Sequence, residues 1–207
     1  MTISIDYYTF LGSPWAYLGS RRLEAMLTRH GATARIIPMD AANVFSVSGG
    51  LPLAKRAPQR QAYRLVELAR WRDFLDVPLT LQPKFFPKPE ALPARLVIGL
   101  RDAGGPDAGA NAIRLAHAVM RAVWAEERDI TDDATLDAIL AENGFDAAAC
   151  RAAAESEAVS QAYAQGTEQA NAAQVFGAPS YVLDGEIFWG QDRLDFLDRA
   201  LARRTGK

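Results

Sequence analysis

The sequence is poor in the side chains that most metal and redox chemistry requires. It has one cysteine, Cys150, and two histidines, His30 and His117, in 207 residues. A single cysteine cannot form an internal disulfide. Neither histidine has a second ligand at metal spacing or a partner that would indicate a Ser-His-Asp triad. We therefore predict no metal site and expect both histidines to serve in packing or at the surface.

Long apolar runs and blocks of like charge are also missing. No apolar stretch approaches the roughly 20 residues that span a bilayer, so we expect no membrane segment. The formal net charge is −2 with acids and bases interspersed, which argues against a general nucleic-acid binder. The chain opens with an acid at Asp6, where a secretory signal would carry a basic segment and an apolar run. Together with Cys150, expected to be a buried small hydrophobe, this predicts a reducing, cytoplasmic location.

The first 45 residues have the pattern of a strand, a helix and a second strand. Residues 3–10 are rich in β-branched and aromatic side chains, as are residues 33–39. Between them, Ser13 is a natural N-cap, Pro14 suits the first helical position, and Gly31 is a plausible C-cap. A helix of this length between two strands implies a right-handed crossover and parallel pairing.

The rest of the chain is first helical and then returns to strands. Helical spacing around Tyr63 to Leu75 is followed by an irregular, proline-containing loop at 78–89 and by helices at about 90–102, 109–127, 133–142, 146–155 and 157–175. Two short apolar runs split by Asp184-Gly185 then predict a hairpin, and a last helix follows over 192–203. We therefore predict an α/β thioredoxin-like fold. Its domain comprises residues 1–45 and 175–207, with an all-helical insertion at 46–174.

In such a fold the reactive group lies where the first strand turns into its helix, because the backbone N–H groups and the helix dipole there favour an anion. The residues at this turn are Ser13, Pro14, Trp15 and Ala16. Redox members of the fold carry Cys-x-x-Cys here, so serine and alanine exclude disulfide exchange at this site. The Ser13 hydroxyl can instead donate to a bound thiolate and lower its pKa from about 8.5. The alternative is that Ser13 is only a helix cap.

Two further segments belong to the same end of the predicted sheet. Pro179, after Ala178, opens a central strand, where a proline cannot donate to the ladder. Its position predicts a cis peptide that leaves the Ala178 backbone free to pair with a peptide-like ligand, rather than an ordinary trans proline. Asp192 is a good N-cap for the last helix. It could also bind an α-ammonium while nearby N–H groups take an α-carboxylate, the two charges that the γ-glutamyl end of glutathione presents.

Three motifs carry a family resemblance: Ser13 to Leu18, Val175 to Tyr181 and Phe188 to Leu194. Together they resemble 2-hydroxychromene-2-carboxylate isomerases, relatives of kappa-class glutathione transferases in the DsbA-like thioredoxin superfamily. The resemblance implies glutathione as cofactor, with its sulfur against Ser13. It implies that the remaining contacts to glutathione come from Arg60, Ala178, Pro179, Trp189, Gly190, Gln191 and Asp192. It also implies that Trp15 and Phe86 lie against an aromatic substrate, and that the protein is a homodimer.

The chain departs from the family pattern at three places. Arg60 stands where the family often has a lysine, and arginine keeps the charge but not the geometry. Gly49-Gly50 stands at the Gly-Asn step that helps to hold glutathione, and Phe10 replaces a common acid.

The resemblance implies cis–trans isomerisation of 2-hydroxychromene-2-carboxylate to trans-o-hydroxybenzylidenepyruvate, or of a similar aromatic ylidenepyruvate, with glutathione regenerated. A kappa-like glutathione transferase or peroxidase is a first alternative. A non-catalytic thioredoxin-fold binding module is a second.

Overall fold

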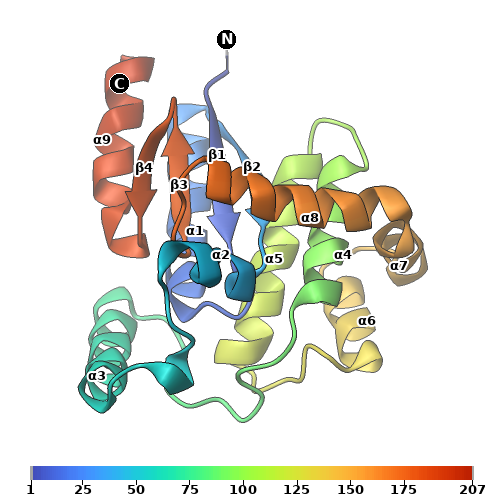
Figure 1. The fold of residues 1–207 in the computed structure, drawn as a ribbon. Helices are drawn as coiled ribbons and strands as arrows, with labels where there is room; N and C mark the ends of the chain where they lie inside the picture. Colours follow the sequence, from blue (N-terminus) through green and yellow to red (C-terminus); the bar gives the residue numbers. More distant parts are fainter. Residues whose placement is uncertain (1, 207) are drawn as a thin grey trace.

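The computed structural model describes residues 2–206, in which four strands form one sheet. The strands are β1 (Ser4–Thr9), β2 (Thr33–Pro38), β3 (Ser180–Leu183) and β4 (Glu186–Trp189), in the order β2-β1-β3-β4. The β1 and β2 strands run parallel, while β3 is antiparallel to both of its neighbours (Figure 1). This confirms the predicted parallel pair, the hairpin and the α/β thioredoxin-like fold.

Helix α1 (Pro14–His30) makes the crossover between the two parallel strands. It begins as predicted, because the Ser13 side chain accepts a hydrogen bond from the Ala16 N–H at 3.2 Å and Pro14 opens the first turn. It also ends as predicted, at Gly31, whose φ of +62° is the left-handed conformation that glycine adopts without a steric penalty.

The segment between β2 and β3 is helical, as expected. It contains α2 (Ala41–Ser48), a short 3₁₀ turn (Leu53–Lys55), α3 (Pro58–Leu75), α4 (Ala91–Asp102), α5 (Ala108–Trp124), α6 (Asp133–Glu142), α7 (Ala147–Glu155) and α8 (Glu157–Ala172). Helices α5 and α8 end three residues before the predicted positions. Helix α2 was not predicted at all, although Asp40 caps it by accepting from the Asn43 N–H at 2.9 Å. The predicted domain boundary between residues 45 and 46 therefore falls inside a helix.

The last helix, α9 (Leu194–Thr205), begins two residues later than predicted. A 3₁₀ turn (Gln191–Arg193) precedes it. The side chain of Asp192 makes no capping hydrogen bond to either element. The interpretation of Asp192 as the N-cap of the last helix is therefore wrong.

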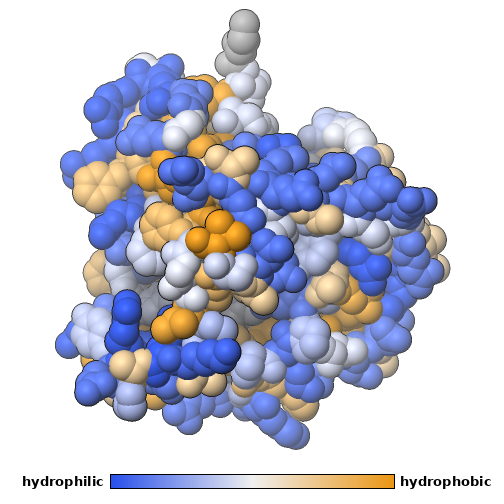
Figure 2. Space-filling model, in the orientation of Figure 1, coloured by the Kyte–Doolittle hydropathy of each residue, from blue (hydrophilic) through white to orange (hydrophobic). Residues whose placement is uncertain are grey.

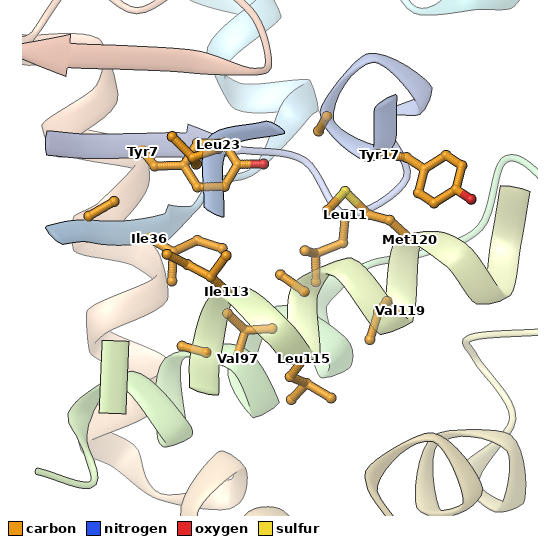
Figure 3. Packing of buried hydrophobic residues seen from close by; sticks show 14 of the residues in the cluster. Tyr7, Leu11, Tyr17, Leu23, Ile36, Val97, Ile113, Leu115, Val119 and Met120 are labelled. Carbon is orange, nitrogen blue, oxygen red and sulfur yellow. The ribbon is translucent and has the colours of Figure 1, made fainter. Parts of the chain in front are cut away.

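Alternate side chains of the parallel strands enter two different cores. Tyr7 and Ile36 face a large cluster formed with α1, α4 and α5, whereas Tyr8 and Ile37 face a smaller cluster formed with α2 and α8. This follows from the two-residue period of a strand. Figure 3 shows the larger cluster, in which side chains of α1 and the sheet pack against those of α4 and α5. The helical segment thus packs on both faces of the sheet and contributes to both clusters.

The surface is mixed rather than uniformly polar. In Figure 2 most of the visible face is hydrophilic, and hydrophobic surface gathers near α2 and the segment that follows it. Val47 and Leu51 are exposed there. Within residues 2–206, no helix has the length and hydrophobicity that crossing a membrane requires.

Candidate functional site

A cleft of about 580 Å³ lies between α3 and the loop that follows β4. Its lining comes from three parts of the chain. These are the start of α1, residues 56–71 in and just before α3, and the segments just before β3 and at the end of β4. Seven of the residues predicted from the sequence line it: Trp15, Arg60, Ala178, Trp189, Gly190, Gln191 and Asp192. Segments more than 100 residues apart in the sequence therefore meet at one place.

Ser13 lies beside this cleft and is itself buried, with 8% of its surface exposed. Its Oγ caps α1 and lies 3.5 Å from the carbonyl oxygen of Ala178, to which it donates a long hydrogen bond. The 17-residue helix α1 points its N-terminus, the positive end of its dipole, at the same spot. The Ser13 turn thus offers both a hydroxyl and a helix dipole to an anion.

The opposite side of this turn is built by the start of β3 and the end of β4. The peptide between Ala178 and Pro179 is cis, as predicted. The Pro179 carbonyl accepts a hydrogen bond from the Gly190 N–H at 2.8 Å, which ties the two strand ends together. A Cβ on Gly177 would lie 2.6 Å from Nε1 of Trp189, so the indole packs directly on glycine backbone. These contacts hold Trp189 as a wall of the cleft.

The loop after β4 presents its residues in different directions. Gly190 has a φ of +102°, which favours glycine. The Gln191 side chain is buried, and its Oε1 and its backbone carbonyl both accept from Arg22 of α1, at 2.7 and 3.1 Å. The Asp192 carboxylate is exposed, lies 3.4 Å from the Arg193 guanidinium and caps no helix. It is therefore the carboxylate of this loop that a cationic group in the cleft can reach.

Positive charge predominates along the α3 side of the cleft. Arg56, Arg60 and Arg64 line it, and none of them forms an ion pair with a carboxylate in the part of the chain that the structure describes. Burial and, to a smaller extent, the nearby Arg56 together lower the pKa of Arg64 to about 10. Because three cations lie together without anions of their own, the cleft favours an anionic ligand.

Phe86 does not line the cleft, although it was predicted to contact an aromatic substrate. It packs instead on Trp124 with 4.7 Å between ring centroids, behind the Ser13 turn. The Trp124 indole N–H donates to the Gly12 carbonyl at 3.2 Å, and this hydrogen bond holds the backbone just before Ser13. The peptide between Phe86 and Pro87 is also cis, which the sequence analysis did not anticipate.

Glu90 is a further residue that sequence reasoning missed. A Cβ on Gly12 would lie 2.5 Å from its Oε1, so the carboxyl packs against the backbone of the turn. Burial raises the pKa of Glu90 to about 7, while hydrogen bonds from the backbone of Gly12 and Leu11 oppose the shift. In a sequence, an acid just before a helix is typical of a helix cap. No sequence signal indicates that the Glu90 carboxyl instead packs against the backbone of the turn.

The two departures at Phe10 and Gly50 have a shared structural basis. Phe10 is buried in the smaller core cluster and meets Phe45 of α2 edge to face, with centroids 5.5 Å apart. The ring of Phe45 also occupies the space that a Cβ on Gly50 would need. An asparagine at Gly50 would therefore collide with Phe45 unless that ring moved.

Both histidines have structural surroundings. His117 is buried, shares a hydrogen bond of 2.7 Å between its Nδ1 and Ser20 Oγ, and stacks on Tyr17. His30 is buried and lies 2.6 Å from an Asp198 carboxylate oxygen. Cys150 is buried as predicted, and burial raises the pKa of its thiol. No group of His, Cys, Asp or Glu side chains that could hold a metal ion occurs in residues 2–206.

A second cleft, of about 640 Å³, lies near the end of α1 and the start of α5. Its two arginines are paired, Arg35 with Asp6 and Arg101 with Asp102. None of the predicted site residues lines it. The smaller cleft beside Ser13 is therefore the candidate site.

Comparisons with known proteins identify the family of the chain. The family model of a DSBA-like thioredoxin domain matches residues 4–202. The chain is 31% identical to a 2-hydroxychromene-2-carboxylate isomerase of Pseudomonas putida, over 96% of this chain and 94% of that protein. It is 30% identical to one of Sphingobium xenophagum, over 97% and 99% respectively. A solved structure of a 2-hydroxychromene-2-carboxylate isomerase superposes with a TM-score of 0.79 at 28% identity, covering 97% of this chain and 95% of the other.

Proposed function

The chain belongs to the 2-hydroxychromene-2-carboxylate isomerase family of DSBA-like thioredoxin domains, and we propose that it is a glutathione-dependent isomerase. The substrate would be an aromatic compound with an unsaturated pyruvate side chain. The reaction would convert 2-hydroxychromene-2-carboxylate, or a close analogue, to trans-o-hydroxybenzylidenepyruvate. The isomerase names of the relatives support the reaction class. The dependence on glutathione is an inference from the site.

The observation that carries this proposal is the convergence of complementary groups on one cleft. Glutathione has two carboxylates, one ammonium group, a peptide backbone and a thiol. The cleft offers Arg56 and Arg60 to carboxylates, Asp192 to an ammonium and the backbone of Ala178 to a peptide. Its volume of about 580 Å³ is in the range of small-molecule sites. The residues present therefore fit glutathione.

The chemistry needs a thiolate near Ser13. Bound glutathione supplies a thiolate that can add reversibly to the conjugated double bond, and the resulting single bond permits rotation. Ser13 would favour the ionised sulfur, because its hydroxyl can turn from the Ala178 carbonyl, a contact of 3.5 Å, toward a charged acceptor. The N-terminus of α1 adds the field of its dipole. Trp15 lines the same cleft and offers an aromatic face to the substrate ring.

The test is the glutathione dependence of turnover. Interconversion of 2-hydroxychromene-2-carboxylate and trans-o-hydroxybenzylidenepyruvate is followed by ultraviolet absorbance, with and without glutathione, and free thiol is counted at the end. We expect a catalysed rate that requires glutathione and leaves its amount unchanged. Conversion of glutathione to a stable conjugate would identify a transferase, and conversion to its disulfide a peroxidase. An equal catalysed rate without glutathione would refute the dependence.

The homodimer and the cytoplasmic location belong to the same proposal. Tyr63, Val66 and Phe74 are large apolar side chains exposed on α3, which supports a covered face in an assembly. The single cysteine, Cys150, supports a reducing location. Light scattering at several protein concentrations tests the dimer, and a constant monomer mass would contradict it.

A further inference from the structure

Arg64 differs from the other arginines of α3 in what surrounds it. Arg70 and Arg72 pair with Glu67 and Asp73 near the surface. The guanidinium of Arg64 has no such partner in residues 2–206. It lies over two aromatic rings instead, 5.7 Å from the centroid of Phe86 and 5.5 Å from that of Trp124. An arginine stacked in this way is held in place while its N–H donors remain available to an anion.

The two rings place Arg64 close to the Ser13 turn. Trp124 donates its indole N–H to the carbonyl of Gly12, and a Cβ on Gly12 would lie 3.6 Å from the ring of Phe86. The Arg64 guanidinium therefore packs on the two aromatic rings that lie against Gly12, the residue next to Ser13. It also lines the cleft.

The other two cleft arginines lie differently. Arg60 is one helical turn before Arg64, is exposed, and is the residue that the family resemblance relates to glutathione. Arg56 precedes α3 and its Nε donates to the Leu51 carbonyl at 2.8 Å. Of the three, Arg64 is thus the cation tied by its packing to the turn where the thiolate would lie.

The proposed substrate carries a carboxylate close to its reacting double bond. In an aromatic ylidenepyruvate the carboxylate is three bonds from the benzylic carbon of the double bond. At about 1.5 Å a bond it stays within roughly 5 Å of that carbon. A substrate positioned for attack beside Ser13 therefore brings its carboxylate near the same turn. Glutathione and this substrate together carry three carboxylates, and the cleft holds three arginines that have no carboxylate partner within residues 2–206.

We infer that Arg64 binds the substrate carboxylate, while Arg56 and Arg60 serve the carboxylates of glutathione. This inference rests on the proposed function, since it names the substrate subsite of the same cleft. Arg64 selects substrates that carry a carboxylate conjugated to the reacting double bond. Its charge is already desolvated by Phe86 and Trp124, so an incoming carboxylate gains more there than at an exposed arginine. The lowered pKa of Arg64 agrees with this, because a nearby anion would relieve the unfavourable surroundings.

The experiment compares an acid with its ester. Benzylidenepyruvate and its methyl ester are titrated into the protein without glutathione, and binding is followed by tryptophan fluorescence. Arg64→Met keeps an apolar chain on the two rings but removes the charge. It should weaken binding of the acid by about ten- to a hundredfold. Binding of the ester should change by less than about threefold. Arg64→Lys should fall between parent and methionine variant, since it keeps the charge without the planar fork.

Arg72→Met is the matched control, because Arg72 is on the same helix, does not line the cleft and pairs with Asp73. It should bind both probes as the parent does. If Arg64→Met does not fold, Arg64→Gln takes its place with the same expected loss. The inference is overturned if the charge-removing variant keeps the parent's preference for acid over ester, or loses both probes equally. Because no glutathione or turnover is involved, failure of the proposed isomerase function would appear separately, in the turnover assay.

Discussion

Replacing Ser13 by alanine separates the two roles that its hydroxyl can have. As a cap, Oγ accepts from the Ala16 N–H at 3.2 Å. As a partner of a bound thiolate, the same hydroxyl would donate its proton, for which the Ala178 carbonyl at 3.5 Å is a weak competitor. The capping role uses the lone pairs of Oγ, and the thiolate role uses its proton. Ser13→Ala removes the whole hydroxyl and so abolishes both roles, but each loss is measured by a different observable.

The two losses differ in size and in where they are measured. Removal of an N-cap costs about 1 kcal/mol of stability. Removal of a hydrogen bond to a charged group costs about 1.5–3 kcal/mol, which raises the pKa of the bound thiol by about one to two units. Turnover near neutral pH should therefore fall by about ten- to a hundredfold. It should recover partly at higher pH, where the thiol ionises without help.

The assay is an ultraviolet titration of the glutathione thiolate bound to the protein, alongside turnover against pH. Ser156→Ala is the matched control, because Ser156 caps α8 by accepting from the Val159 N–H at 3.3 Å and lies outside the cleft lining. The control should lose stability similarly but keep the parent's thiol pKa. If Ser13→Ala titrates and turns over like the parent, Ser13 is only a helix cap and the reasoning is refuted.

Three other predictions follow from neighbouring residues. Asp192→Asn should weaken glutathione binding by about ten- to a hundredfold with little change in melting temperature, since Asp192 caps no helix; calorimetry showing unchanged affinity and a sharp loss of stability would contradict it. Burial raises the pKa of Glu90 to about 7, so the folded state keeps this proton between about pH 5 and 7 after the unfolded chain has lost it. The stability that the parent holds over Glu90→Gln should thus decline by up to about 3 kcal/mol as pH rises from 5 to 8, and melting curves with a constant difference would exclude this. Gly19→Ala should cost about 1–3 kcal/mol, because a Cβ there would lie 2.8 Å from the Tyr181 hydroxyl. Gly109→Ala, with 3.5 Å to its nearest neighbour, should be neutral or stabilising in urea unfolding, and equal effects of the two changes would refute the packing argument.

Most of the scaffold could be predicted because its signals are local. Ser13 and Pro14 mark the start of α1, Gly31 marks its end, and Asp184-Gly185 marks the hairpin. Helix α2 was missed because its β-branched and aromatic residues hide a short helix, although Asp40 was a capping signal. Asp192 was misread as a cap because a 3₁₀ turn delays α9 by two residues.

The parts of the site that could not be predicted depend on packing between distant segments. Arg56, Arg60 and Arg64 recur at a four-residue spacing, which in a sequence looks like an exposed helical face. Only the approach of Phe86 and Trp124 makes Arg64 a half-buried cation, and it has no ion pair within residues 2–206. Burial likewise raises the pKa of Glu90, and the turn on which its carboxyl packs lies about 80 residues earlier in the chain.

A calorimetric titration of the parent chain with reduced glutathione tests the central claim most directly. The account predicts one glutathione bound per chain, with a Kd between low micromolar and millimolar. The melting temperature should rise with glutathione concentration, by an amount equivalent to about 2.7 kcal/mol at a hundred times Kd. An absence of both binding heat and thermal shift, at glutathione concentrations far above that range, would contradict the claim that this cleft holds glutathione.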